Sequence, residues 1–139
     1  MINLTCLCGA IHIEAAKAPD FIHACNCRLC SGTGAYWAYY HPSEVSVTGA
    51  TTGYSRSDKP DPGACIHFCP TCGATTHFAL TEGAIARFGD TMMGVNMRLA
   101  AEDDLVGIEL RYPDGRGWPG TGDFTYVRPP EIISPPDRQ

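Results

Sequence analysis

The stretch Cys25-Asn26-Cys27-Arg28-Leu29-Cys30 places three thiols within six residues, and together with two similar groups it decides the fold. The other groups are Cys6-Leu7-Cys8-Gly9 and Phe68-Cys69-Pro70-Thr71-Cys72-Gly73. Cysteines separated by one or two residues can bind one cation at about 2.3 Å from each sulfur, whereas a disulfide would strain so short a loop. Seven of the eight cysteines lie in such groups, and we therefore predict metal sites. A reduced, metal-free cluster or a disulfide is the alternative.

The composition predicts one domain with many turns. The chain has 139 residues, of which 44% are hydrophobic, and it contains 15 glycines and 11 prolines. This length suffices for one sizeable core and is short for two domains. A formal net charge of −5 and basic residues that occur singly argue against nucleic-acid binding, which needs clustered cations. The oligomeric state stays open.

The first residues and the hydrophobic pattern predict a cytoplasmic protein. Met1-Ile2-Asn3-Leu4-Thr5 contains no basic leader and no apolar run for export. No segment approaches the roughly 20 apolar residues that span a bilayer. Thiols stay reduced in the cytosol, where clustered cysteines bind zinc more often than they form disulfides. We therefore expect zinc as the metal and no membrane partner.

Short apolar runs between turn-forming residues predict a mainly β fold, a small antiparallel domain at residues 1–127. Strands are expected at residues 2–5, 10–14, 35–40, 44–48, 64–68, 75–80, 84–88 and 92–99. Residues 31–34 are expected to be a flexible polar segment, residues 55–63 a loop and residues 101–104 the start of a short helix. The proline-rich residues 128–139 are predicted to form an extended C-terminal tail.

Two of the cysteine groups predict a structural zinc site. Cys6 and Cys8 form one pair, Cys69 and Cys72 form the other, and four thiolates make the closed tetrahedral set typical of structural zinc. A glycine follows each pair and permits a positive φ, which turns backbone amides toward the sulfurs. Binding of a structural zinc ion contributes about 10–16 kcal/mol of free energy. The free energy of unfolding of a whole domain is of similar size, about 5–15 kcal/mol. Loss of this site is therefore expected to unfold the protein.

The middle group predicts a second zinc ion with an open coordination position. Cys25, Cys27 and Cys30 offer three thiolates without an obvious fourth ligand, which is the usual plan of a catalytic zinc site. Three thiolates leave a net charge of about −1, which favours binding and deprotonating a thiol over activating water. Arg28 either offsets part of that charge or is an ordinary exposed arginine. Other pairings of the cysteines are possible, and the alternative fourth ligands are His23, His41, His67, His77 and Cys65.

These motifs resemble those of the glutathione-dependent formaldehyde-activating enzymes, a family that also includes the centromere protein V proteins. The likeness runs from about residue 4 to about residue 100 and rests on the order Cys-x-Cys-Gly, Cys-x-Cys-x-x-Cys and Phe-Cys-x-x-Cys-Gly. The segments Gly34-Ala35-Tyr36-Trp37 and Gly94-Val95-Asn96-Met97-Arg98 also resemble the family.

The resemblance implies a β-tent fold stapled by zinc, with one structural ion and one catalytic-type ion per chain. By position, the structural ligands are Cys6, Cys8, Cys69 and Cys72, and the catalytic ligands are Cys25, Cys27 and Cys30. The chain departs from the family at Asn26, where members commonly have histidine. It also departs at Cys65, which has no counterpart in the pattern and is expected to be a buried free thiol.

The activity implied by the resemblance is that of a zinc-dependent carbon–sulfur lyase or synthase. The enzyme would join glutathione, or another thiol, to a small aldehyde such as formaldehyde, or release the aldehyde from the adduct. Glutathione carries two carboxylates, and the candidate residues that bind it are Arg28, Arg56 and Arg98. Tyr36 and Trp37 either line the substrate pocket or pack in the core. A non-catalytic, zinc-stapled β binding module is the alternative function.

Overall fold

Two β-sheets form the frame of residues 1–137, the part of the chain that the computed structural model describes. In chain order the strands are β1 (Ile2–Thr5), β2 (His12–Ala15), β3 (Phe21–His23), β4 (Trp37–Tyr40), β5 (Val45–Thr48), β6 (Thr52–Ser55), β7 (Ala64–Phe68), β8 (Thr75–Leu80), β9 (Met93–Asn96), β10 (Glu109–Pro113) and β11 (Tyr126–Ile132). The helices are α1 (Arg28–Thr33), α2 (Glu82–Phe88) and α3 (Glu102–Leu105), with the 3-10 turns η1 (Pro42–Glu44) and η2 (Met97–Leu99).

The strand order differs between the two sheets, but nearly all neighbours are antiparallel. The smaller sheet has the order β1-β2-β5, and the larger one has the order β11-β10-β3-β4-β9-β8-β7-β6. Strands β3 and β10 are parallel, whereas the other paired strands run antiparallel. The mainly antiparallel β fold predicted from the sequence is thus confirmed.

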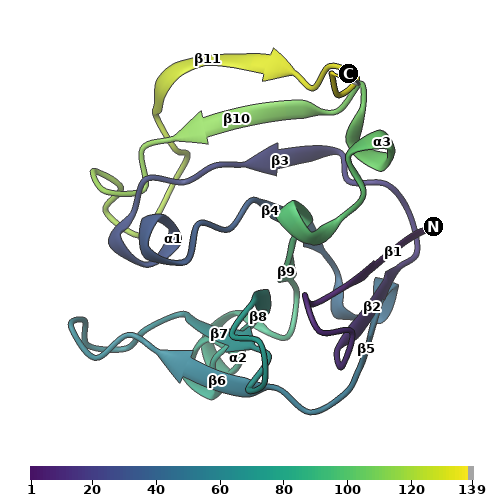
Figure 1. The fold of residues 1–139 in the computed structure, drawn as a ribbon. Helices are drawn as coiled ribbons and strands as arrows, with labels where there is room; N and C mark the ends of the chain where they lie inside the picture. The colour runs from purple at the N-terminus through teal and green to yellow at the C-terminus, as the bar shows by residue number, and fades with distance from the viewer. Residues whose placement is uncertain (138–139) are drawn as a thin grey trace.

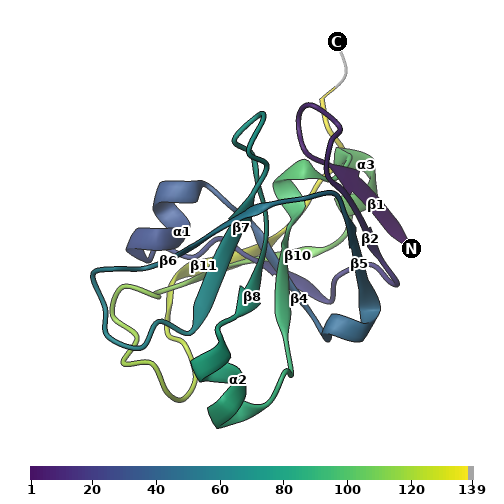
Figure 2. The same cartoon turned by 90° about the horizontal axis from the view of Figure 1, so that it is seen from below.

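The larger sheet is strongly bent. In Figure 1 its β11-β10-β3 end lies above its β8-β7-β6 end, and β4 and β9 connect the two ends. Helix α1 lies on one side of this sheet and the smaller sheet lies on the other, as Figure 2 also shows from below. The cysteines at the start of α1 therefore lie on one side of the larger sheet, and those of the smaller sheet lie on the other side.

Strand β4 contributes side chains to both faces of the bent sheet. Ala38 and Tyr40 pack in the larger core, which includes Cys69, whereas Trp37 packs in a smaller core beside Cys30. Successive side chains of a strand point to opposite faces, so one strand can support both groups of thiols.

The larger core fills the space between the two sheets. Its most deeply buried side chains include Ile11, Ile13, Ile22, Val95 and Met97. Burying one such side chain contributes about 1.5–3 kcal/mol. Hydrophobic burial is therefore one of two forces that can hold the sheets together, and the cysteine group described below is the other.

Residues 84–88, expected to be a strand, belong instead to helix α2. The Thr81 side chain caps this helix by accepting a hydrogen bond from the Ala84 backbone N–H. Glu82 lies in the first turn, where a negative charge is favourable, and the helix ends at Gly89, whose φ is 81°. These capping residues outweigh the short apolar run on which the strand prediction rested.

Residues 31–34, expected to be flexible, mostly belong to helix α1. The helix begins after Cys27, whose sulfur accepts a hydrogen bond from the Cys30 backbone N–H. It ends at Gly34, which has a left-handed φ of 69° and donates its N–H to the Cys30 carbonyl oxygen at 3.0 Å. Two of the three middle cysteines are therefore held by a short helix that is fixed at both ends, Cys27 as its N-cap and Cys30 within it. The short helix expected from residue 101 onward is present as α3.

The proline-rich C-terminal segment is less independent than expected. Residues 128–132 lie in β11, which pairs with β10 through two irregularities of register. Prolines are tolerated there because an edge strand needs ladder hydrogen bonds on one side only. Strands β3, β6 and β10 were not predicted. Strand β6 contains Gly53, where a Cβ would lie only 2.8 Å from the Cys65 sulfur.

Candidate metal centres

Four cysteine sulfurs meet where the β1–β2 turn contacts the β7–β8 turn. The ligand atoms of Cys6, Cys8, Cys69 and Cys72 all lie within 4.8 Å of one another. The Cys8 Sγ lies 3.6 Å from both the Cys6 Sγ and the Cys69 Sγ. Sulfurs bound at about 2.3 Å to a tetrahedral ion are about 3.8 Å apart. The four sulfurs therefore have the spacing that a tetrahedral, thiolate-bound ion such as zinc requires.

The backbone of both turns directs N–H groups at these sulfurs. The Ile11 N–H donates to the Cys6 Sγ at 3.2 Å, and the Thr71 N–H donates to the Cys69 Sγ at 3.4 Å. Donors of this kind stabilise the thiolate form and orient the ligands of a metal ion. Each turn closes at a glycine with a positive φ, namely Gly9 and Gly73.

The four-cysteine centre, Cys6, Cys8, Cys69 and Cys72, is largely enclosed. Cys6 and Cys69 are 2% and 0% exposed, whereas Cys8 faces solvent. The backbone N–H of Ala74 lowers the pKa of Cys72 to about 6, so this thiol ionises readily at neutral pH. A closed set of four sulfurs with supporting amides suits a structural ion.

Three more sulfurs meet at the start of α1, and we call this cluster of Cys25, Cys27 and Cys30 the triad. Their ligand atoms lie within 4.8 Å of one another. The Cys27 N–H donates to the Cys25 Sγ at 3.4 Å, and the Cys30 N–H donates to the Cys27 Sγ at 3.3 Å. Within residues 1–137, no histidine, carboxylate or further cysteine joins this cluster. None of the alternative fourth ligands, the four histidines and Cys65, thus places a ligand atom in this cluster within the described residues.

Hydrogen bonds among the three thiols favour one thiolate at a time, so the triad needs a cation to ionise fully. Contacts with the Cys25 and Cys30 side chains lower the pKa of Cys27, whereas contacts with Cys25 and Cys27 raise the pKa of Cys30 well above its usual range. One thiolate is therefore stable at this site, but three are stable only if a nearby cation offsets their charge. Three clustered sulfurs are a donor set that suits zinc.

Trp37 contacts the triad directly from the core. It is 2% exposed, and its indole Nε1–H donates a hydrogen bond to the Cys30 Sγ at 3.3 Å. The Phe78 ring packs edge-on against it, with the ring centres 4.9 Å apart. Trp37 is therefore a core residue that also contacts a candidate metal ligand, Cys30.

Arg56 is a candidate cation beside the triad. It forms a bidentate ion pair with Asp58, in which Nε lies 2.8 Å from Oδ1 and Nη2 lies 2.6 Å from Oδ2. Asp58 is the main cause of the raised pKa of Arg56, and the thiolates of Cys27 and Cys30 contribute less. Arg56 therefore lies close enough to the triad to interact with its charge.

The other two predicted arginines have different surroundings. Arg28 is the exposed first residue of α1. The Arg98 guanidinium lies 3.9 Å from the centre of the Tyr36 ring, and Tyr36 packs against the larger core. Trp37, the next residue, packs beside the triad in the smaller core. Arg98 is thus on the opposite face of the sheet from the triad.

His23 and Tyr39 lie beside the triad, and sequence reasoning did not single them out as a pair. His23 is 4% exposed, and its Nδ1 lies 3.0 Å from the Tyr39 hydroxyl, while its Nε2 has no partner among residues 1–137. Burial, with a smaller effect of Arg111, lowers the pKa of His23 to about 4. Burial raises the pKa of Tyr39, and the triad thiolates add to this effect. The position of His23 two residues before Cys25 was the available signal.

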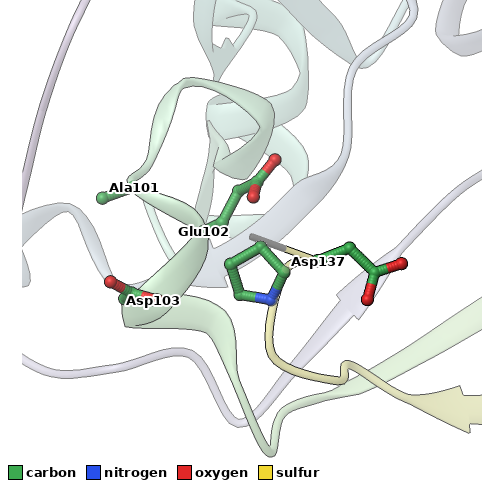
Figure 3. Close-up of a pocket in the computed structure, with 5 residues that line it drawn as sticks. Ala101, Glu102, Asp103 and Asp137 are labelled. Atoms are coloured by element: carbon green, nitrogen blue, oxygen red, sulfur yellow. The ribbon is translucent and has the colours of Figure 1, made fainter. Parts of the chain in front are cut away.

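A hollow of about 300 Å³ lies elsewhere, between α3 and the C-terminal segment. It is lined by Ala101, Glu102, Asp103, Pro136 and Asp137. Figure 3 shows that its three carboxylates point in different directions. Within the described residues they form no cluster comparable with the cysteine groups. Among the described residues, the candidate metal-binding groups are therefore the two cysteine clusters.

Comparisons with known proteins agree with this geometry. Residues 1–102 match the family described as "Glutathione-dependent formaldehyde-activating enzyme". The chain belongs to this family. A crystal structure of a Rhodobacter sphaeroides protein, a target of the Northeast Structural Genomics consortium, is similar at 30% identity with a TM-score of 0.55. That match covers 70% of this chain and 86% of the other. Among curated proteins, no relative matches.

The matched region of this glutathione-dependent formaldehyde-activating enzyme family member contains both cysteine centres. All seven clustered cysteines lie within residues 1–102, whereas β10 and β11 lie beyond them. The family resemblance inferred from the three motifs is therefore confirmed. Across residues 1–137, no helix combines the length and the apolar character needed to cross a membrane.

Proposed function

We propose that this chain catalyses the reversible joining of glutathione, or a related small thiol, to formaldehyde, as a zinc-dependent carbon–sulfur lyase or synthase. The observation that carries the proposal is the triad, because three converging sulfurs leave one position of a tetrahedral ion for a substrate sulfur. Membership of a family described by glutathione and formaldehyde supports this choice of substrates. The four-cysteine centre has its full set of ligands and is assigned a structural role.

In this proposal Cys25, Cys27 and Cys30 hold one zinc ion, and the four-cysteine centre holds the other. Bound zinc supplies positive charge that favours the thiolate form of a thiol beside it. The Trp37 N–H withdraws charge from the Cys30 sulfur and so reduces repulsion between the triad and an incoming thiolate.

Arg56 is the proposed partner of a substrate carboxylate. A guanidinium binds a carboxylate through two parallel hydrogen bonds, and Arg56 already forms such a pair with Asp58. Asp58 is exposed, so a substrate carboxylate can take its place without leaving a buried charge unpaired. Within residues 1–137, Arg28 and Arg98 have no contact that supports the same role.

The proposed reaction is the addition of the substrate sulfur to the carbonyl carbon of formaldehyde. A carbon–sulfur bond forms and the carbonyl π bond breaks, which leaves negative charge on the oxygen. The proton released from the thiol passes to solvent, and the oxygen takes up a proton to give the S-hydroxymethyl adduct, a hemithioacetal. The reverse sequence releases formaldehyde from the adduct, so one site serves both directions.

The variant Cys27→Ser tests whether the triad has a catalytic or a structural role. Cys27 caps α1, and serine is also a favourable cap, so the helix is expected to persist while one ligand is lost. The catalysed rate of exchange between free glutathione and its formaldehyde adduct, measured by exchange NMR, should fall by more than about 100-fold, since even outer-shell changes cost about 10–100-fold.

The matched control is Cys65→Ser, because this thiol lies outside both cysteine clusters. It should keep the exchange rate of the unmodified protein. Loss of structure in Cys27→Ser would instead show that the triad is structural. In cobalt-loaded protein, glutathione should also change the visible spectrum, and an unresponsive spectrum would favour the non-catalytic binding module.

A further inference from the structure

Asn26 connects the triad to a segment outside the region that the family match covers. Its Nδ2–H donates to the Asp114 Oδ1 at 2.9 Å, and its Oδ1 accepts from the Arg116 backbone N–H at 3.0 Å. The Gly117 N–H donates to the same Asp114 oxygen at 3.2 Å. The family match ends at residue 102, so these contacts come from a part of the chain beyond it.

Gly115 lies directly against the first ligand of the triad. A Cβ at this position would collide with the Cys25 Sγ and would lie 3.1 Å from the Cys27 Cβ. Glycine is therefore the residue that allows the backbone to approach the sulfur so closely. The backbone around Gly115 packs against the half-buried Cys25, and the hydrogen bonds of Asn26 hold this backbone in place.

The same segment continues over the buried histidine. The Trp118 ring packs against Phe124 with ring centres 4.6 Å apart, and Phe124 packs edge-on against His23 at 5.6 Å. We call residues 114–124 the cap. One end of the cap thus packs against a candidate ligand, and the other end packs against His23, whose Nε2 is buried without a partner among residues 1–137.

We infer that the cap, latched by Asn26, controls which molecules reach the triad and so determines its selectivity among thiols. The cap packs against Cys25 so closely that no Cβ fits between Gly115 and the sulfur. A thiol that reaches the triad therefore passes beside the cap, and thiols that are broad beside the sulfur collide with it. The selectivity among thiols rests on the proposed function, whereas the control of access to Cys25 by the cap does not.

The variant Asn26→Asp tests the latch without changing the size of the side chain. It replaces the Nδ2–H donor with an oxygen that repels the Asp114 carboxylate. Alkylation of Cys25 by iodoacetamide, followed by peptide mass mapping of the zinc-loaded protein, should become about tenfold faster. The double variant Asn26→Asp/Asp114→Asn exchanges donor and acceptor and should restore the slow rate. Asp114→Ala gives a second route to an open cap if Asn26→Asp does not fold.

The matched control is Asp123→Ala, which removes an exposed carboxylate from the cap away from the latch. It should alkylate at the rate of the unmodified protein. If Asn26→Asp or Asp114→Ala also keeps that rate, the inference is wrong.

Selectivity is measured in cobalt-loaded protein by titration with glutathione and with thiophenol. Opening the cap should reduce the preference for glutathione by about tenfold. Faster alkylation with an unchanged preference would overturn the role in selectivity. If neither thiol alters the spectrum of the unmodified protein, the proposed function fails, and the alkylation rates alone decide whether the cap controls access.

Discussion

The indole N–H of Trp37 donates to the Cys30 sulfur in surroundings that exclude water, since Trp37 is 2% exposed. A hydrogen bond to a charged group contributes about 1.5–3 kcal/mol. Trp37→Phe keeps an aromatic ring against Phe78 but removes the donor. We expect the zinc affinity of the triad to fall by about tenfold, measured by competition with a chromophoric chelator.

Tyr36→Phe is the control for this measurement, because Tyr36 is the neighbouring residue and packs on the opposite face of the sheet. Its zinc affinity should equal that of the unmodified protein. Equal affinities in Trp37→Phe and Tyr36→Phe would show that the indole N–H does not support the ligand.

At the scale of elements, local signals were sufficient for some predictions and not for others. Strands β1, β7 and β8 were predicted with the observed bounds, because alternation and turn residues are visible within a few positions. Strands β3 and β10 were both missed, and their parallel pairing joins segments that lie far apart in sequence. Helix α2 was missed because its caps at Thr81 and Gly89 were given less weight than its apolar residues.

The same distinction applies to the candidate sites. The cysteine groups could be found because the ligands of one ion are spaced by one or two residues in each turn. The pair of His23 with Tyr39 and the pair of Asn26 with Asp114 could not be found in this way. Each joins two segments that only the strand order brings together, and spacing along the chain carries no record of that order.

The β7–β8 pair brings two histidines into contact and gives the fold a dependence on pH. The rings of His67 and His77 stack with centres 4.5 Å apart. Burial, with a smaller effect of His67, lowers the pKa of His77 from 6.5 to about 4. Between these values the unfolded chain binds a proton that the folded chain does not bind. Stability therefore falls as the pH falls from about 6.5 toward 4.

We expect His77→Phe to reduce this pH dependence. The variant lacks the titrating group but keeps a ring against His67, so the loss of stability between pH 7 and pH 5 should be about 2 kcal/mol smaller. Urea unfolding at a fixed zinc concentration measures the difference. Protonation of the thiolates occurs in both proteins and cancels in the comparison. An identical pH dependence in the two proteins would contradict the assignment of the effect to His77.

At the scale of the whole molecule, the four-cysteine centre joins two distant parts of the chain. Cys6 and Cys8 lie between the first two strands of the smaller sheet, and Cys69 and Cys72 lie between β7 and β8 of the larger one. One ion bound there is a cross-link between the sheets, in addition to the larger core. The triad is contributed by a single segment and makes no such link. The two centres therefore differ in what their loss does to the fold.

Cys8→Ala tests this difference, because Cys8 is exposed and its removal costs little packing. Loss of a ligand should remove a large part of the about 10–16 kcal/mol that a structural zinc contributes. Since a domain is stable by about 5–15 kcal/mol, we expect a loss of several kcal/mol and partial unfolding. Circular dichroism and urea unfolding, with Cys65→Ser as the control, measure this loss. A Cys8→Ala protein with normal stability would mean that the hydrophobic core alone joins the two sheets.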